Sequence, residues 1–152
     1  MNYWLIKSEP KAYSISDLEQ EQETIWDGVR NFQARNFLRQ MNEGDLAFFY
    51  HSNTKLPAIV GLTQITKTGI NDPTQFDLNS QYYDPKSTLE SPRWQTVVVQ
   101  FVEAFPQAIS LSTLKQEFNA EELLVVRRGN RLSVMPVPET VAQRIMTIGR
   151  SK

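Results

Sequence analysis

Cysteine is absent from the 152-residue sequence, and histidine occurs only once, as His51. The lack of cysteine excludes disulfides, cysteine nucleophiles and thiolate metal sites, and it fits a reducing, cytoplasmic environment, which we expect for this chain. A metal site would then depend on carboxylates and amides, and no loop has the ligand spacing of a calcium site. We therefore expect no metal and no cofactor.

The sequence also lacks a long apolar run and an excess of one charge. Its formal net charge is −1, whereas a nucleic-acid coat protein is strongly basic. Any contact with nucleic acid should therefore come from a local patch and a specific pocket. No stretch approaches the length of a membrane span, and residues 1–6 lack the basic start of a signal peptide, so we expect no membrane partner.

Motifs of the common enzyme classes are missing as well. There is no Gly-x-Ser-x-Gly elbow, no Walker loop, no dinucleotide fingerprint and no His-Glu-x-x-His pair. His51 is the one near-neutral base, and with Ser8 or Asp27 it would suit a small hydrolase or nucleobase-processing enzyme. A local hydrogen bond at the end of a strand is the simpler expectation for His51. A binding protein is therefore the leading hypothesis, and an enzyme is the alternative.

What the sequence does contain is the pattern of a single α+β domain over residues 1–152. Its length and its 40% hydrophobic content suit one compact domain with a buried core. Apolar patterns predict the main strands at residues 3–7, 46–51, 57–67, 93–101 and 132–137. Capping residues predict helices that begin near Ser14, at Asn31, near Ser110 and at Pro138, and the polar stretch 69–92 is expected to be a long loop. Because strands and helices do not alternate strictly, we expect a mostly antiparallel or barrel-like sheet.

The segment Trp26-Asp27-Gly28-Val29-Arg30-Asn31 is the strongest candidate for a binding site. Trp26 precedes a predicted turn, and Asn31 begins a predicted helix. An indole face, a carboxylate, a guanidinium and free backbone N–H groups then converge, which is what stacking a base and reading its edge requires. The same spacing is explained equally well by Trp26 in the core and by Asp27 and Asn31 as caps.

Two groups of arginines are candidates for phosphate contacts. One group is Arg30, Arg35 and Arg39, and the other is Arg127, Arg128 and Arg131. On a chain with a net charge of −1, a solvated surface is the competing interpretation of each group.

Several motifs together resemble the EVE domain, a family that includes the thymocyte nuclear proteins and their bacterial relatives. These motifs are residues 3–10 (YWLIKSEP), 26–31 (WDGVRN), 34–38 (ARNFL) and 48–52 (FFYHS). The resemblance continues through residues 83–85 (YDP), Trp94 and residues 131–134 (RLSV), and it covers essentially the whole chain. It implies a PUA-like fold, a pseudo-barrel of mixed strands flanked by helices, with kinship to the YTH readers of modified bases.

The resemblance also implies a ligand and a site. The partner would be DNA or RNA carrying a modified base, most of all a modified cytosine, held in an aromatic pocket without turnover. Separately, we expect the protein to be a monomer. Trp26 resembles a cage tryptophan of YTH domains, and the candidates for the other cage aromatics are Trp94, Tyr83 and Phe49. The expected ligand-binding residues are Lys7, Ser8, Glu9, Trp26, Asp27, Val29, Arg30, Asn31, Tyr50, His51, Ser52, Trp94 and Ser133. A small-molecule or protein adaptor on the same fold is a further alternative, which the slightly acidic net charge favours.

Overall fold

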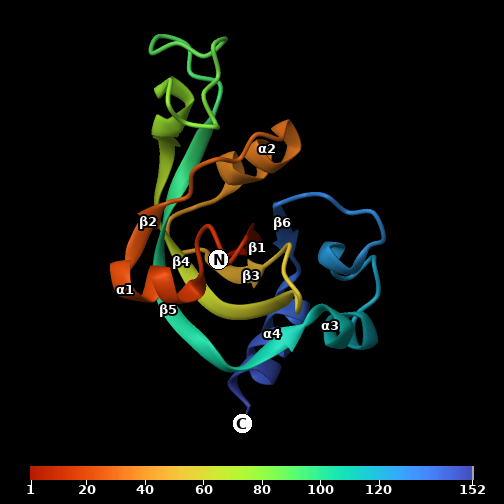
Figure 1. Cartoon of the computed structure of the whole chain (residues 1–152). Helices are drawn as coiled ribbons and strands as arrows, with labels where there is room; N and C mark the ends of the chain where they lie inside the picture. The colour runs from red at the N-terminus through yellow and green to blue at the C-terminus, as the bar shows by residue number, and fades with distance from the viewer. Residues whose placement is uncertain (152) are drawn as a thin grey trace.

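The computed structural model describes residues 1–151, in which four α-helices surround one mixed sheet of six strands (Figure 1). The strand order is β2-β5-β4-β3-β1-β6. The strands are β1 (Tyr3–Ser8), β2 (Glu23–Ile25), β3 (Leu46–His51), β4 (Ala58–Asn71), β5 (Gln95–Ser110) and β6 (Val134–Val137). The helices are α1 (Ile15–Glu21), α2 (Phe32–Gln40), α3 (Leu111–Glu117) and α4 (Glu139–Arg150), with short 3-10 helices η1 (Pro73–Phe76) and η2 (Leu124–Val126). The predicted α+β fold class is confirmed.

Strands β1 and β3 run parallel, whereas the other neighbouring pairs in the described part of the chain are antiparallel. The chain between them forms α1, β2 and α2, a crossover that parallel pairing requires. Parallel strands finish at the same edge of a sheet, so the last residue of β1, Ser8, pairs with the last residue of β3, His51. The residues that follow both strands therefore meet at one edge.

Hydrophobic cores cover both faces of the sheet, because side chains alternate along its central strands. On β3, Phe48 and Tyr50 pack with α3 and α4, while Ala47 and Phe49 pack with α1 and α2. Both phenylalanines are fully buried. The same alternation in β1 places Leu5 in the core with Phe48 and Ile6 in the core with Phe49.

Polar side chains fix the helix starts that the sequence predicts. Ser14 accepts from the backbone N–H of Asp17 at 3.2 Å, and the Asp17 carboxylate accepts from the Ser14 N–H at 2.9 Å, which completes a capping box before α1. Asn31 caps α2 and Ser110 caps α3 through the same kind of bond. These three predicted helix starts are confirmed.

Strands β4 and β5 are longer than the sequence predicted. β4 continues to Asn71 as a ribbon in which half-buried and exposed side chains alternate, and β5 continues to Ser110, with Phe105 and Ile109 still in the core. Several register shifts along this pair mark irregularities that bend it. The far end of this pair and residues 72–94 extend away from the core at the top of Figure 1. We call residues 72–94 the projection.

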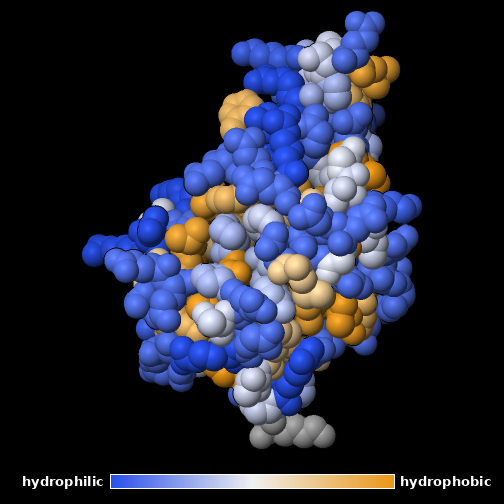
Figure 2. Space-filling view, turned by 180° about the vertical axis from the view of Figure 1, so that it is seen from behind, coloured by the Kyte–Doolittle hydropathy of each residue, from blue (hydrophilic) through white to orange (hydrophobic). Residues whose placement is uncertain are grey.

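The surface seen from behind is mostly hydrophilic, with apolar side chains scattered over it (Figure 2). Within residues 1–151, no helix is both long enough and apolar enough to cross a membrane.

Candidate functional site

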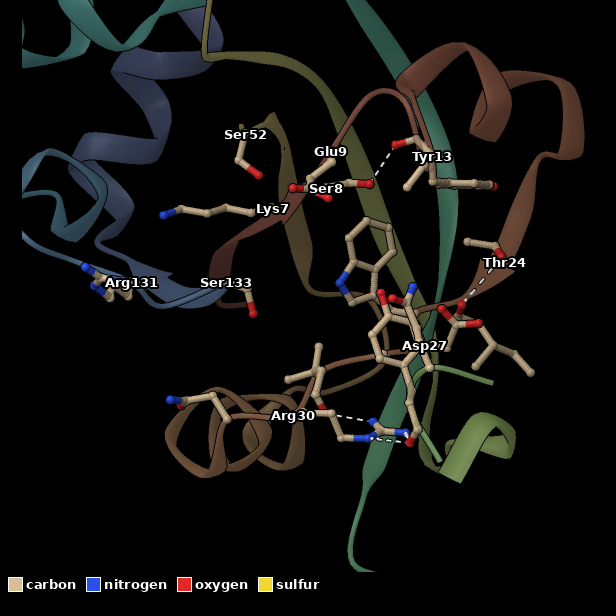
Figure 3. A pocket seen from close by; sticks show the side chains of 18 of the residues that line it. Lys7, Ser8, Glu9, Tyr13, Thr24, Asp27, Arg30, Ser52, Arg131 and Ser133 are labelled. Carbon is tan, nitrogen blue, oxygen red and sulfur yellow. Dashed lines mark hydrogen bonds between the residues drawn. The ribbon is translucent and has the colours of Figure 1, made fainter. Parts of the chain in front are cut away.

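A pocket of about 860 Å³ opens on the side of the sheet that carries α1 and α2 (Figure 3). This volume lies in the range of ordinary small-molecule sites. The residues predicted for the ligand or its phosphates that line it are Lys7, Ser8, Glu9, Trp26, Asp27, Val29, Arg30, Asn31, Ser52, Arg131 and Ser133. In Figure 3, Lys7, Arg131 and Ser133 lie on one side of the pocket, and Thr24 and Asp27 lie on the other.

Backbone hydrogen bonds at the ends of three strands bring the first side of the pocket together. The Lys7 N–H donates to the carbonyl of Ser133 at 2.9 Å, and the Ser52 N–H donates to the carbonyl of Ser8 at 2.9 Å. The Ser8 hydroxyl donates to the carbonyl of Tyr13 at 2.6 Å, which ties the segment before α1 to the same edge (Figure 3). This side of the pocket is therefore built on rigid strand ends.

Trp26 belongs both to the core and to the pocket wall. The backbone N–H of Trp26 donates to the carbonyl of Val97 at 2.9 Å, and the backbone carbonyl of Trp26 accepts from the Thr96 hydroxyl. Strand β5 therefore holds the backbone of Trp26 through both of its polar groups. The indole is only 6% exposed and meets Phe49 edge to face, with 5.5 Å between ring centroids. The two interpretations of Trp26 that the spacing left open are therefore compatible.

Tyr82 forms an aromatic wall that the sequence did not identify. It comes from the projection and reaches Gly28 so closely that a β-carbon at Gly28 would lie 2.7 Å from its ring. The backbone of Gly28 has φ +84°, a conformation that favours glycine. The tyrosine beside it, Tyr83, had been a cage candidate but does not line the pocket, so the prediction was one residue away from the wall. Tyr13 is a second lining aromatic that the motifs did not reveal.

Arg30 has a different role from the expected phosphate contact. Its guanidinium donates twice to the carbonyl of Tyr82, at 2.8 and 3.0 Å, and once each to Val29, Asp72 and Thr74. Arginine has five N–H donors, so all of them are engaged within the protein. Arg30 therefore clamps the 26–31 segment to the projection and has no donor left for a phosphate.

Asp27 and Asn31 offer complementary polar groups at the rim. Partial burial raises the pKa of Asp27, and repulsion from Asp72 raises it further, while Arg30 opposes the shift. The side-chain Oδ1 of Asn31 accepts from the backbone N–H of Ala34 at 2.9 Å, so the side-chain NH2 group is the part available to a ligand. The site thus presents an acceptor and a donor four residues apart on one loop.

Lys7 and Arg131 give the opposite side of the pocket a positive charge. Burial lowers the pKa of Lys7, whose ammonium lies 5.8 Å from the centre of the Tyr50 ring. Neither cation forms an ion pair within residues 1–151. Both are therefore free to meet an anionic group in the pocket.

Three predicted ligand residues lie outside the pocket. Tyr50 points into the core under α4, because alternation places it on the same face as Phe48. Nε2 of His51 accepts from the backbone N–H of Ile15 at 3.1 Å, so His51 forms a hydrogen bond within the protein at the end of β3. Burial lowers the pKa of His51. Trp94 stacks on Phe32, and its Nε1 donates to the carboxylate of Asp84 at 2.7 Å.

The other predicted phosphate contacts also lie outside the pocket. Arg35 donates to the carbonyl of Arg93 at 2.9 Å, and Arg39 donates to the side chain of Gln95 at 2.7 Å, so both join α2 to the start of β5. Arg127 and Arg128 are exposed in the turn after η2. Among the described residues, no group of His, Cys, Asp or Glu side chains is arranged to hold a metal ion.

Comparison with known proteins gives matches over nearly the full chain. The model of the EVE domain matches residues 2–148. Human thymocyte nuclear protein 1 is 43% identical over 156 residues, covering 91% of this chain and 69% of that protein. The sequence-based resemblance is confirmed.

Solved structures agree with these matches. A Pseudomonas syringae protein has a TM-score of 0.91 and 48% identity, covering 95% of this chain and 97% of that one. Human THYN1, solved in complex with 5-methylcytosine containing DNA, has a TM-score of 0.91 and 40% identity, covering 100% and 99%. The Pho92 YTH domain in complex with m6A has a TM-score of 0.55 at 12% identity, covering 99% and 84%, which shows a shared fold alone.

Proposed function

Because the chain belongs to the EVE domain family, we propose that it binds a modified base of DNA, a methylated cytosine above all, and leaves that base chemically unchanged. The observation that carries the proposal is the pocket itself, in which aromatic walls from Trp26 and Tyr82 stand beside the polar groups of Asp27 and Asn31. The relative solved with 5-methylcytosine DNA supports the choice of ligand.

The chemistry of cytosine fits this arrangement. The Asp27 carboxylate accepts from the exocyclic amine, the Asn31 amide donates to the ring carbonyl, and the aromatic walls hold the flat faces and the methyl group. Removing a base from a duplex costs a few kcal/mol. Stacking on an aromatic side chain contributes roughly 1–3 kcal/mol per base, so the walls and the edge contacts together can offset that cost.

The positive side of the pocket suits the rest of the nucleotide. Lys7 and Arg131 lie across the pocket from Asp27 (Figure 3). In this proposal they meet the phosphate attached to the captured base. Binding without turnover is supported by the position of His51, whose Nε2 is committed to Ile15 instead of facing the ligand.

The test is a titration of short oligonucleotides that carry cytosine, 5-methylcytosine, 5-hydroxymethylcytosine or N6-methyladenine, as DNA and as RNA. We expect the tightest binding to DNA with a methylated cytosine. Asp27→Ala should lose most of this preference with little change in melting temperature, because Asp27 is an exposed residue whose carboxylate is only partly covered. Trp26→Ala should abolish binding but also cost stability, because the indole packs in the core.

Trp26→Phe is the matched control, since it keeps a flat ring in the wall and should retain part of the affinity. Equal affinity for all four oligonucleotides, or a folded Asp27→Ala protein with the original preference, would refute the proposal. A preference for the RNA series would instead identify RNA as the partner.

A further inference from the structure

Phe32 is an exposed aromatic side chain that the pocket does not use. It is the first residue of α2, directly after the rim residue Asn31, and its side chain remains 48% exposed. The ring stacks on Trp94 with 5.0 Å between centroids and 17° between planes, so its orientation is fixed. A large apolar ring that is held rigid and left half in water suits a flat partner.

Guanidinium groups surround this ring. The Cζ of Arg35 lies 4.7 Å from the centre of the Phe32 ring, and the Cζ of Arg93 lies 5.5 Å from it. Arg35 and Arg39 have no carboxylate partner within the described residues, and Arg93 shares only Asp84, at 3.4 Å. The pKa of Arg35 is lowered by burial and by repulsion from Arg39 and Arg93, as expected where three cations share a single carboxylate.

A series of ring and guanidinium contacts connects this surface to the pocket. The Arg30 guanidinium lies 5.6 Å from the centre of the Tyr82 ring in the pocket wall and 5.1 Å from Trp94, and Trp94 stacks on Phe32. The surface is therefore a near neighbour of the pocket. A strand that delivers one nucleotide to the pocket has its next nucleotides within reach of Phe32.

We propose that Phe32, Arg35 and Arg93 form a second nucleic-acid contact, which stacks an unpaired base of the same strand next to the captured one. Bases stack on aromatic rings and on guanidinium planes regardless of sequence, and arginines beside the ring meet the flanking phosphates. This inference rests on the proposed function, because it requires that the ligand be a nucleic acid. It assigns the surface a role in affinity and leaves the choice of base to the pocket.

The experiment measures binding of single-stranded oligonucleotides, with and without one 5-methylcytosine, to the whole chain and to Phe32 variants. Phe32→Ala should weaken both affinities roughly 5- to 150-fold, the range of one lost base stack. The ratio between the two affinities should stay unchanged, because the pocket sets it. Phe32→Tyr should retain affinity, and Phe32→Leu, which keeps an apolar contact to Trp94 without a flat ring, should lose it.

Leu89→Ala is the control, since Leu89 is an apolar side chain, 81% exposed on the projection, that has no flat ring to stack a base; the affinity of this variant should match that of the unmodified chain. Arg35→Gln should reduce the slope of log affinity against log salt by about 0.7. Unchanged affinity in folded Phe32→Ala and Phe32→Leu proteins would overturn the inference without affecting the proposed function of the pocket. A change in the ratio between the affinities for methylated and unmethylated oligonucleotides would show that Phe32 acts through the pocket wall. Competition by polyglutamate as strong as that by an oligonucleotide would show a general anion-binding surface. Either result would also overturn the inference. No binding of any oligonucleotide by the unmodified chain would reject the proposed function as well.

Discussion

Asp72 secures the loop that carries the pocket tryptophan, and replacing it by alanine tests how the pocket is held. Its side chain is only 2% exposed and accepts from the Gly28 N–H at 2.8 Å and from Arg30 at 3.0 Å. It also accepts from the N–H of Thr74 at 2.8 Å, where it caps η1. One carboxylate therefore joins the 26–31 segment to the projection.

Asp72→Ala should lower the free energy of unfolding by about 3 kcal/mol. Removing one partner of a buried ion pair costs roughly 3–5 kcal/mol, because the remaining charge loses its compensation. The Arg30 side chain is 21% exposed, so water can solvate part of it and the lower end of the range applies. In a protein of this size, 1 kcal/mol corresponds to about 2–4 °C, so the melting temperature should fall by about 6–12 °C.

Urea titration and thermal melting measure this loss, and Glu103→Ala provides the control. The Arg150–Glu103 pair has the same chemistry, but its side chains are 51% and 28% exposed, so its loss should cost less than about 1 kcal/mol. Equal losses in the two variants would refute the argument that burial gives the Asp72 contact its weight. Asp72→Asn should fall between them, because it keeps one carbonyl acceptor.

Two further changes address the loop and the imidazole. Gly28→Ala should lower the free energy of unfolding, measured by urea titration, by at least about 1–2 kcal/mol and should weaken oligonucleotide binding, because a side chain there is strained and meets the Tyr82 ring. Gly44 has φ +93° and open space around it, so Gly44→Ala should lower stability alone. Equal losses of binding in the two variants would contradict this reasoning. The lowered pKa of His51 means that the unfolded chain binds a proton more readily, so stability should be complete above the ordinary value of 6.5 and decline as the pH falls from there toward the lowered pKa. His51→Gln, which keeps an acceptor for the Ile15 N–H, should show a weaker decline in urea midpoints over that range, and an identical decline would exclude His51 as its source.

Local signals in the sequence were sufficient for most of the fold. The Ala34 and Leu38 spacing after the Asn31 cap predicts α2, because a helix is stabilised by contacts three and four residues apart. The lengths of β4 and β5 were underestimated, because their added parts are of mixed polarity. The end of β4 is half-exposed and paired with β5, and in the second half of β5 the buried residues Phe105 and Ile109 are separated by exposed ones.

The site was less accessible to sequence reasoning, because its key contacts are not local. The roles of Arg30 and Gly28 depend on Asp72 and Tyr82, which lie more than 40 residues further along the chain. Nothing in the 26–31 motif alone separates a clamp from a ligand contact. Trp94 was expected in the pocket for the same reason, since its contacts with Arg30 and Phe32 join residues more than 60 positions apart in the chain.

The full engagement of the Arg30 guanidinium affects how variants of this protein should be interpreted. In a screen that scores only ligand binding, any Arg30 substitution would register as a lost contact, although the side chain has no donor to give a ligand. A lysine would keep the charge but could replace at most three of the five bonds. Binding data on this loop therefore need a parallel measurement of folding.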